Sequence, residues 1–125
     1  MRRTLMAVTL LLSAACSSPT GIPGTALTVL AQGESLRLVN HSDRRTFYFI
    51  YEREAAAVIN WAQCVDPSRC PSLLPGGQTA VPYSAIGGYE RGKSEAIVWS
   101  WEAVPGPARQ PVPGPGPVQA VVIRL

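Results

Sequence analysis

The feature that most constrains the fold is a series of short segments rich in Val, Leu and aromatic residues, bounded by Gly, Pro, Asn or Asp. Such segments suit a pleated, half-buried strand, and turn formers between them are typical of an all-β domain. We expect strands at residues 25–32, 35–40, 46–52, 79–83, 95–104 and 118–125. Some six short strands with turns between them predict an antiparallel β-sandwich or barrel.

Two of these segments have apolar residues on both faces. In 46–52 (TFYFIYE), Phe47 and Phe49 point to one side while Tyr48 and Ile50 point to the other, because successive side chains alternate along a strand. Segment 95–104 (EAIVWSWEAV) alternates in the same way. Both faces of 46–52 need cover, so we expect it to be a central strand.

Other segments carry weaker signals. Residues 54–63 suit either a helical turn or an extended chain, and 71–78 is expected to be a turn because Pro and Gly interrupt it. Trp61, close to Cys64, suggests an indole packed beside a disulfide. The stretch 105–117 holds half of the twelve prolines. It is interpreted either as a solvated hairpin loop or as a polyproline-type ligand.

The first fifteen residues have the three parts of an export signal. Arg2 and Arg3 precede an uncharged apolar stretch from Thr4 to Ala15, which ends in small residues. The stretch is too short to span a bilayer, which takes about 20 apolar residues. We therefore expect residues 1–15 to be a signal peptide and the mature protein to be exported.

The sequence Ser13-Ala14-Ala15-Cys16 resembles the lipobox of bacterial lipoprotein precursors. The resemblance implies that Cys16 carries lipid as the mature N-terminus, with residues 16–24 as a flexible tether and 25–125 as the folded domain. Localisation would then be the cell envelope, at the outer membrane or the outer face of the cytoplasmic membrane. A second interpretation stays open, in which an ordinary signal peptidase leaves Cys16 as a free thiol.

The charge of the chain argues against a nucleic-acid partner. The formal net charge is +3, and two of these charges are Arg2 and Arg3, so the mature part carries +1. Apart from Arg44 and Arg45 it holds no adjacent basic pair, and therefore lacks a basic surface for a phosphate backbone.

Cys64 and Cys70 have five residues between them and are expected to form a disulfide in an oxidising compartment. A redox pair usually has only two intervening residues, and a structural zinc site needs four ligands. After Cys16, the chain has these two cysteines and one histidine. We expect neither a metal nor another cofactor.

The sequence offers no convincing catalytic constellation. His41, Ser42 and Asp43 are adjacent, whereas a catalytic triad is assembled from distant segments. A blue-copper site needs two histidines, and His41 is the only one. Glu52 and Glu54 share a strand face, and a glycosidase acid–base pair is the alternative to solvated surface charge. We expect a protein that is not an enzyme.

All nine aromatic residues lie between positions 47 and 101. Core packing is the usual role of such rings in a small domain. The alternative is a binding patch for a glycan or an envelope protein, with four candidate residues: Tyr48, Tyr51, Trp99 and Trp101.

Four stretches within residues 25–104 are informative: LRLVNHSDRRTFYFIY, WAQC with the following cysteine, LPGGQTAVPY and the Trp-containing late strand. In these stretches the mature region resembles small uncharacterised bacterial lipoproteins with immunoglobulin-like β-sandwich domains. The resemblance implies a sandwich of six to seven strands and brings no catalytic residues. The expected function is a non-enzymatic binding module of the cell envelope, or alternatively a structural accessory subunit or an unrecognised hydrolase.

Mass spectrometry of the protein from its native membrane tests the N-terminal prediction. We expect a chain that begins at Cys16 and carries two or three acyl chains, and we expect Cys16→Ser to appear in the soluble exported fraction. Each buried methylene contributes about 0.8 kcal/mol, so loss of the acyl chains should release the domain. An unmodified Cys16 thiol, or an intact signal, would contradict the prediction.

Overall fold

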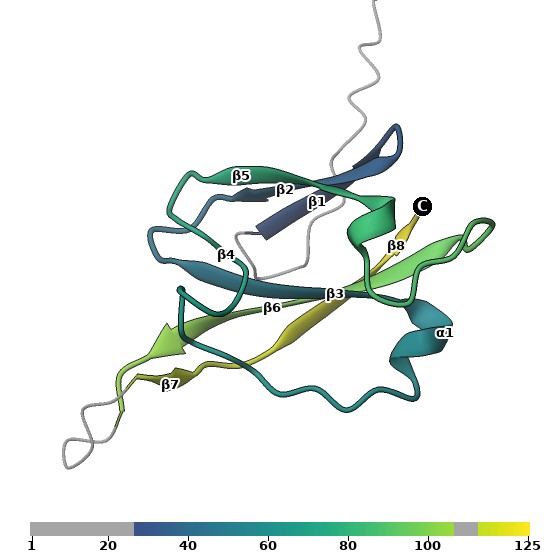
Figure 1. Ribbon diagram of the computed structural model, residues 1–125. Coiled ribbons are helices and arrows are strands. Elements are labelled where there is room, and N and C mark those ends of the chain that lie inside the picture. The colour runs from purple at the N-terminus through teal and green to yellow at the C-terminus, as the bar shows by residue number, and fades with distance from the viewer. Residues whose placement is uncertain (1–26, 107–112) are drawn as a thin grey trace, which may run out of the picture.

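The computed structural model describes residues 27–106 and 113–125, which form a two-sheet sandwich (Figure 1). The smaller sheet has the strand order β1-β2-β5, from β1 (Leu27–Gln32), β2 (Ser35–Asn40) and β5 (Gln78–Pro82). The larger sheet is built around β3 (Thr46–Glu52) and β6 (Glu95–Val104). All strand pairs are antiparallel, which confirms the predicted all-β sandwich.

Strand β6 is the longest and has neighbours on both sides. It pairs with β3 along one edge and with β8 (Gln119–Arg124) and β7 (Gly114–Pro115) along the other. The short β4 (Ser72–Leu73) pairs with the first two residues of β3. The two central strands therefore carry the apolar alternation that the sequence predicts for them.

The main core lies between the two sheets. Inward-facing side chains of β1 and β2 meet the inward face of β3 and β6, because one side of each strand turns toward the other sheet. Its fully buried members are Leu27, Val29, Leu36, Leu38, Ala96 and Val98. The β1–β2 hairpin that supplies the first four turns at Gly33, whose φ of 62° lies in the left-handed region that glycine adopts without strain.

Several local expectations need correction. The predicted turn at 71–78 contains the short strand β4, and the predicted proline-rich loop contains β7. Both are two-residue strands that depend on pairing with a neighbour and leave no periodic signal in the sequence. The undecided segment 54–63 begins within helix α1 (Arg53–Ala56), and a 3₁₀ turn, η1 (Tyr83–Ala85), follows β5. Residues 25–26 and part of the proline-rich stretch, 107–112, lie outside the described residues.

A buried asparagine joins the two sheets at one end of the sandwich. The Asn40 side chain is fully buried, and its amide donates hydrogen bonds to the carbonyl oxygens of Arg44, Leu73 and Leu74. Its carbonyl oxygen accepts from the Ser42 N–H at 3.0 Å and from the Thr46 hydroxyl at 3.2 Å. One side chain thus links the end of β2 to the β2–β3 turn and to β4.

We expect Asn40→Ala to lower the free energy of unfolding by about 2–4 kcal/mol, because it leaves buried carbonyl and hydroxyl groups without partners. Urea unfolding followed by tryptophan fluorescence measures the loss. The exposed Asn60 supplies the matched control, and Asn60→Ala should change stability by less than about 0.5 kcal/mol. Equal stabilities of the two variants would contradict the role assigned to Asn40.

Candidate functional site

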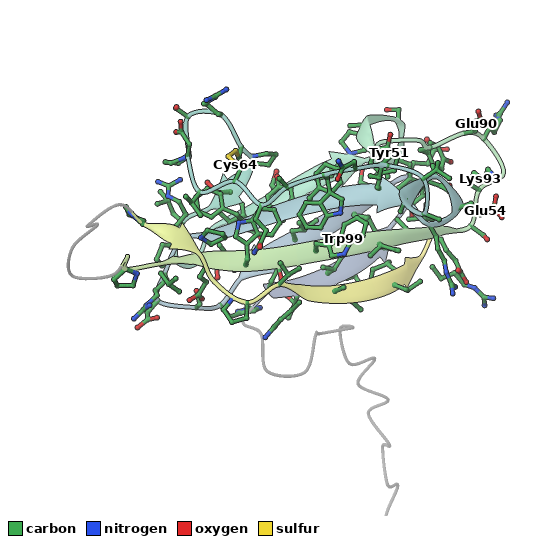
Figure 2. All side chains as sticks on the ribbon, turned by 90° about the horizontal axis from the view of Figure 1, so that it is seen from below. Tyr51, Glu54, Cys64, Glu90, Lys93 and Trp99 are labelled. Atoms are coloured by element: carbon green, nitrogen blue, oxygen red, sulfur yellow. A yellow bond between two sulfur atoms is a disulfide. The ribbon has the colours of Figure 1, made fainter. Side chains whose placement is uncertain are left out.

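The outer face of the larger sheet carries most of the aromatic residues. Because side chains alternate along β3 and β6, the odd-numbered residues of both strands project away from the sandwich core. We call this surface the aromatic face, and its members are Phe47, Phe49, Tyr51, Ile97, Trp99 and Trp101. Figure 2 looks toward this side of the sheet, with Trp99 on β6 and Tyr51 near the end of β3.

A long segment without strands, residues 57–71, runs across this face and is here called the cover segment (Figure 1). Its central contact is Trp61, whose ring centroid lies 5.1 Å from that of Phe49 and 4.9 Å from that of Trp99. Trp61 also contacts Trp101 at a centroid distance of 5.6 Å. The cover segment therefore supplies the ring that completes a second apolar cluster, separate from the inter-sheet core.

Hydrogen bonds and the disulfide hold the far end of the cover segment. The indole N–H of Trp101 donates to the Cys64 carbonyl oxygen at 2.8 Å, and the Gln63 amide donates to the Gly116 carbonyl oxygen at 2.8 Å. Cys64 and Cys70 are joined in a disulfide with their Cα atoms 6.2 Å apart, as the sequence predicts. The indole bonded to this ring is Trp101, whereas Trp61 lies over the centre of the sheet.

The acidic turn inside the disulfide ring is ordered by its own serine. The Ser68 hydroxyl and backbone N–H both donate to the Asp66 carboxylate, at 2.7 and 2.9 Å. These hydrogen bonds lower the pKa of Asp66, with a smaller contribution from Arg69. The turn therefore presents an ionised carboxylate at the rim of the molecule.

Part of the aromatic face extends to side chains that remain open to solvent. Across β6, Trp99 has Ala120 of β8 as its neighbour, and Ile97 has Val122. Ala120 is exposed, and Val122 is 45% exposed. At Trp99 and Ile97 the aromatic face therefore borders exposed side chains of β8, and we call this border the open part of the aromatic face.

Two indole donors on this face are free. In the described residues, the indole N–H groups of Trp61 and Trp99 donate to no protein atom, unlike that of Trp101. Neither of the two nitrogens is buried without a partner, so both can reach water or a ligand. The ring faces can pack against the apolar surface of a sugar ring or a peptide, and the free N–H groups can donate hydrogen bonds to its oxygen atoms.

The structure separates the four residues predicted as a binding patch. Tyr51, Trp99 and Trp101 belong to the aromatic face, but Trp101 is only 4% exposed and its N–H is used. Tyr48 lies on the opposite face of β3, packed against the inter-sheet core, where burial raises the pKa of its hydroxyl. Cys16, the predicted lipidation site, lies outside the described residues.

Sequence reasoning missed Trp61 and Phe49 as parts of the same cluster. Phe49 could have been predicted from the sequence, because it lies two residues before Tyr51 on β3 and therefore shares its face. Trp61 lies in a segment without periodicity, so only the folded chain shows which face it covers.

Tyr51 also has unusually close backbone neighbours. A Cβ atom at Gly87 would lie 2.2 Å from the Tyr51 ring, so only glycine allows the chain to approach this closely. The carbonyl oxygen of Gly87 accepts the Glu52 backbone N–H at 2.8 Å. The 84–94 loop thereby fixes the Tyr51 ring at the edge of the aromatic face.

A second site, a charged hollow of about 480 Å³, lies beside the end of β3 and the start of β6. Two of its lining residues, Glu54 and Lys93, are labelled in Figure 2. Lys93 donates to the Glu54 carboxylate at 2.6 Å, and Arg53 forms an ion pair with Glu95. These partners raise the pKa values of Lys93 and Arg53. The hollow is thus lined by charges that are already paired.

Glu52, also in the hollow, caps helix α1. Its carboxylate accepts the backbone N–H groups of Ala55 at 2.8 Å and Glu54 at 3.1 Å. The hydrogen bond from Ala55 is the main reason that the pKa of Glu52 lies below its ordinary value. A general acid in a glycosidase has a raised pKa, so Glu52 has the opposite character.

Comparison with protein-family models, curated proteins and solved structures found no match to this chain. Within residues 27–106 and 113–125, no group of three or more His, Cys, Asp or Glu side chains is arranged to hold a metal ion. No helix in the same residues is long and apolar enough to cross a membrane.

The capping role of Glu52 predicts a pH dependence of stability. Because the folded protein lowers the pKa of Glu52, the ionised carboxylate stabilises the fold above the ordinary glutamate pKa of about 4.3. That stabilisation is lost as the pH falls through the lowered value. We expect wild-type protein to be more stable than Glu52→Gln near neutral pH, and this difference to shrink on acidification. Thermal unfolding monitored by circular dichroism measures it.

Glu34→Gln is the matched control, because Glu34 is exposed and its carboxylate makes no hydrogen bond within the described chain. Its melting temperature should follow the wild-type value at every pH. A constant difference between wild type and Glu52→Gln from about pH 6 to pH 3 would show that Glu52 does not act through its charge.

Proposed function

We propose that this protein is an exported, lipid-anchored module of the bacterial cell envelope that binds a protein or a glycan through its aromatic face. The observation that carries the binding part is the incomplete cover of this face, where Trp99 and its free indole N–H adjoin exposed residues of β8. The export and anchoring part rests on the basic and apolar start of the chain and on Cys16.

The packing of the aromatic face supports a preformed binding surface. Phe49 and Trp61 are stacked with an interplanar angle of 18°, and Trp99 is tilted against both rings. Rings held by neighbours lose little conformational entropy when a ligand binds, so more of the contact energy appears as affinity. Aromatic anchors are also the residues that contribute most to typical binding interfaces.

The charged hollow offers less support for an enzymatic function. Glu54 and Glu95 each pair with a cation, and Glu52 caps a helix with a lowered pKa. Hydrolysis by paired carboxylates needs one group that holds its proton near neutral pH and one that is free to act as base or nucleophile. This arrangement favours a binding module over the alternative of an envelope hydrolase.

The test is photo-crosslinking in intact cells. Val58, in the cover segment, is 87% exposed, so it can carry a benzophenone side chain without disturbing the fold. We expect an adduct from position 58, and we expect Trp99→Ala to reduce its yield roughly tenfold, the usual effect of removing an aromatic anchor. Gel electrophoresis and mass spectrometry identify the adduct.

Leu74, an exposed apolar residue in the β4–β5 turn, is the control position and should give no adduct. Trp99→Phe should retain most of the yield, because it keeps a ring on the face. An adduct that forms equally from positions 58 and 74, or that survives Trp99→Ala, rules out the aromatic face as the binding site. Because the crosslinker is outside β8, this result does not depend on the pairing of that strand.

A further inference from the structure

Strand β8 has a free edge. The Leu125 N–H donates to the Ser94 carbonyl oxygen at 2.7 Å, so the odd-numbered residues of β8 direct their backbone groups toward β6. The even-numbered residues Ala120, Val122 and Arg124 therefore direct theirs away from the sheet. Within the described residues, β8 pairs with β6 alone, and no backbone partner lies on its outer side.

The three residues with outward backbone groups are all exposed. Figure 2 shows β8 as the yellow strand along the margin of the larger sheet. A row of unpaired N–H and C=O groups on exposed residues is a template for another strand. The chemistry of this edge therefore selects an extended polypeptide.

The other sheet edges lack one or more of these properties. β4 and β7 have two residues each, and β5 ends at Pro82, which has no N–H to donate. β1 has six residues, but its side chains at Leu27 and Val29 are buried in the core. In the described chain, β8 is thus the long edge whose outward-directed backbone lies on exposed residues.

We propose that two copies of this chain associate by antiparallel pairing of their β8 strands, with Val122 opposite the second copy's Val122. In this register Arg124 faces the second copy's Ala120, and the two Arg124 side chains lie at opposite ends of the pair. On the core side, Ile123 faces the second copy's Val121. No like charges are opposed, and apolar side chains meet on both faces.

Neighbouring registers fit less well. A shift by one residue would place inner side chains opposite outer ones, which the pleat of an antiparallel pair does not allow. A register with Val121 on the symmetry axis would place Ile123 against the second copy's Gln119, so that an apolar and a polar side chain face each other. Of these two registers with a residue on the twofold axis, the Val122 register is therefore the better matched.

The paired sheets would place both aromatic faces on the same side, because the twofold axis between antiparallel strands runs perpendicular to the sheet. A dimer would also bury the half-exposed Val122. The proposal goes beyond the binding function, and the dimer itself does not depend on that function. If both hold, the dimer presents two binding faces to one ligand-bearing surface, which increases avidity.

The test introduces a negative or a positive charge at position 122 of the full-length exported protein, which is purified in mild detergent. Analytical ultracentrifugation should show a concentration-dependent dimer for wild type. Val122→Glu and Val122→Lys should each associate about tenfold more weakly, because like charges would face each other on the axis. An equimolar mixture of the two variants should restore dimers, because Glu then faces Lys.

Circular dichroism confirms that each variant monomer is folded before its mass is measured. Leu30, on the smaller sheet, is the matched control, since its exposure of 43% is close to the 45% of Val122. Leu30→Glu should leave the dimer unchanged. Val122→Pro, which removes an outward N–H that β6 does not use, should abolish pairing.

Four results would overturn the proposal. The first three are wild-type protein that remains monomeric up to about 100 μM, a dimer that persists in Val122→Glu, and a mixture of charge variants that stays monomeric. Capture of an unrelated extended peptide by a monomeric wild type would assign the edge to a different occupant and would also overturn it. These results are read from the mass of the purified protein, separately from the crosslink at Val58.

Discussion

The pairing of β3 with β6 is the constraint on which the rest of the structure depends. In this register Ile50 faces Val98 on one side of the sheet, and Phe49 faces Trp99 on the other. If one strand shifted by one residue relative to the other, its aromatic side chains would turn toward the aliphatic side of the sheet. Its aliphatic side chains would turn toward the aromatic side, and both clusters would be disrupted. The smaller sheet covers the aliphatic side, and the cover segment covers much of the aromatic side.

Because both faces of the larger sheet are apolar, each needs a layer of chain packed on it. This explains why a long segment without strands, residues 57–71, is kept in a fixed position. Three kinds of interaction hold these residues in place. These are the contact of the Trp61 ring with Phe49, the hydrogen bond from Trp101 to Cys64, and the disulfide. A ring closed by so few residues contributes about 2 kcal/mol through the unfolded chain. Its second role is positional, because it keeps the Cys64 carbonyl oxygen where the Trp101 indole can donate to it.

The functional proposals follow from what these covers leave open. The cover segment leaves the β8 side of the aromatic face in solvent, and β8 itself lacks an outer neighbour in the described chain. A sheet face and a sheet edge call for different partners, since a face offers side chains and an edge offers backbone groups. The charged hollow differs from both, because its ion pairs and its helix cap already use its charges.

The sequence by itself determined the six longer strand segments, the alternation of β3 and β6 and the pairing of Cys64 with Cys70. These are local signals: period-two patterning, turn residues and a short spacing between cysteines. It also predicts export and a lipid anchor from the first sixteen residues. The predicted segments 46–52 and 95–104 agree with β3 and β6, because both strands are long and carry apolar residues on both faces.

Only the tertiary structure decided which aromatic residues meet. Tyr48 and Tyr51 are both tyrosines of one strand, but their opposite parity places one beside the core and the other on the aromatic face. Trp61, β4 and β7 have no periodic pattern of their own, so their positions come from packing and pairing with distant segments. Which edge of the sheet stays free is likewise decided by strand order, a property of the assembled fold that no single segment encodes.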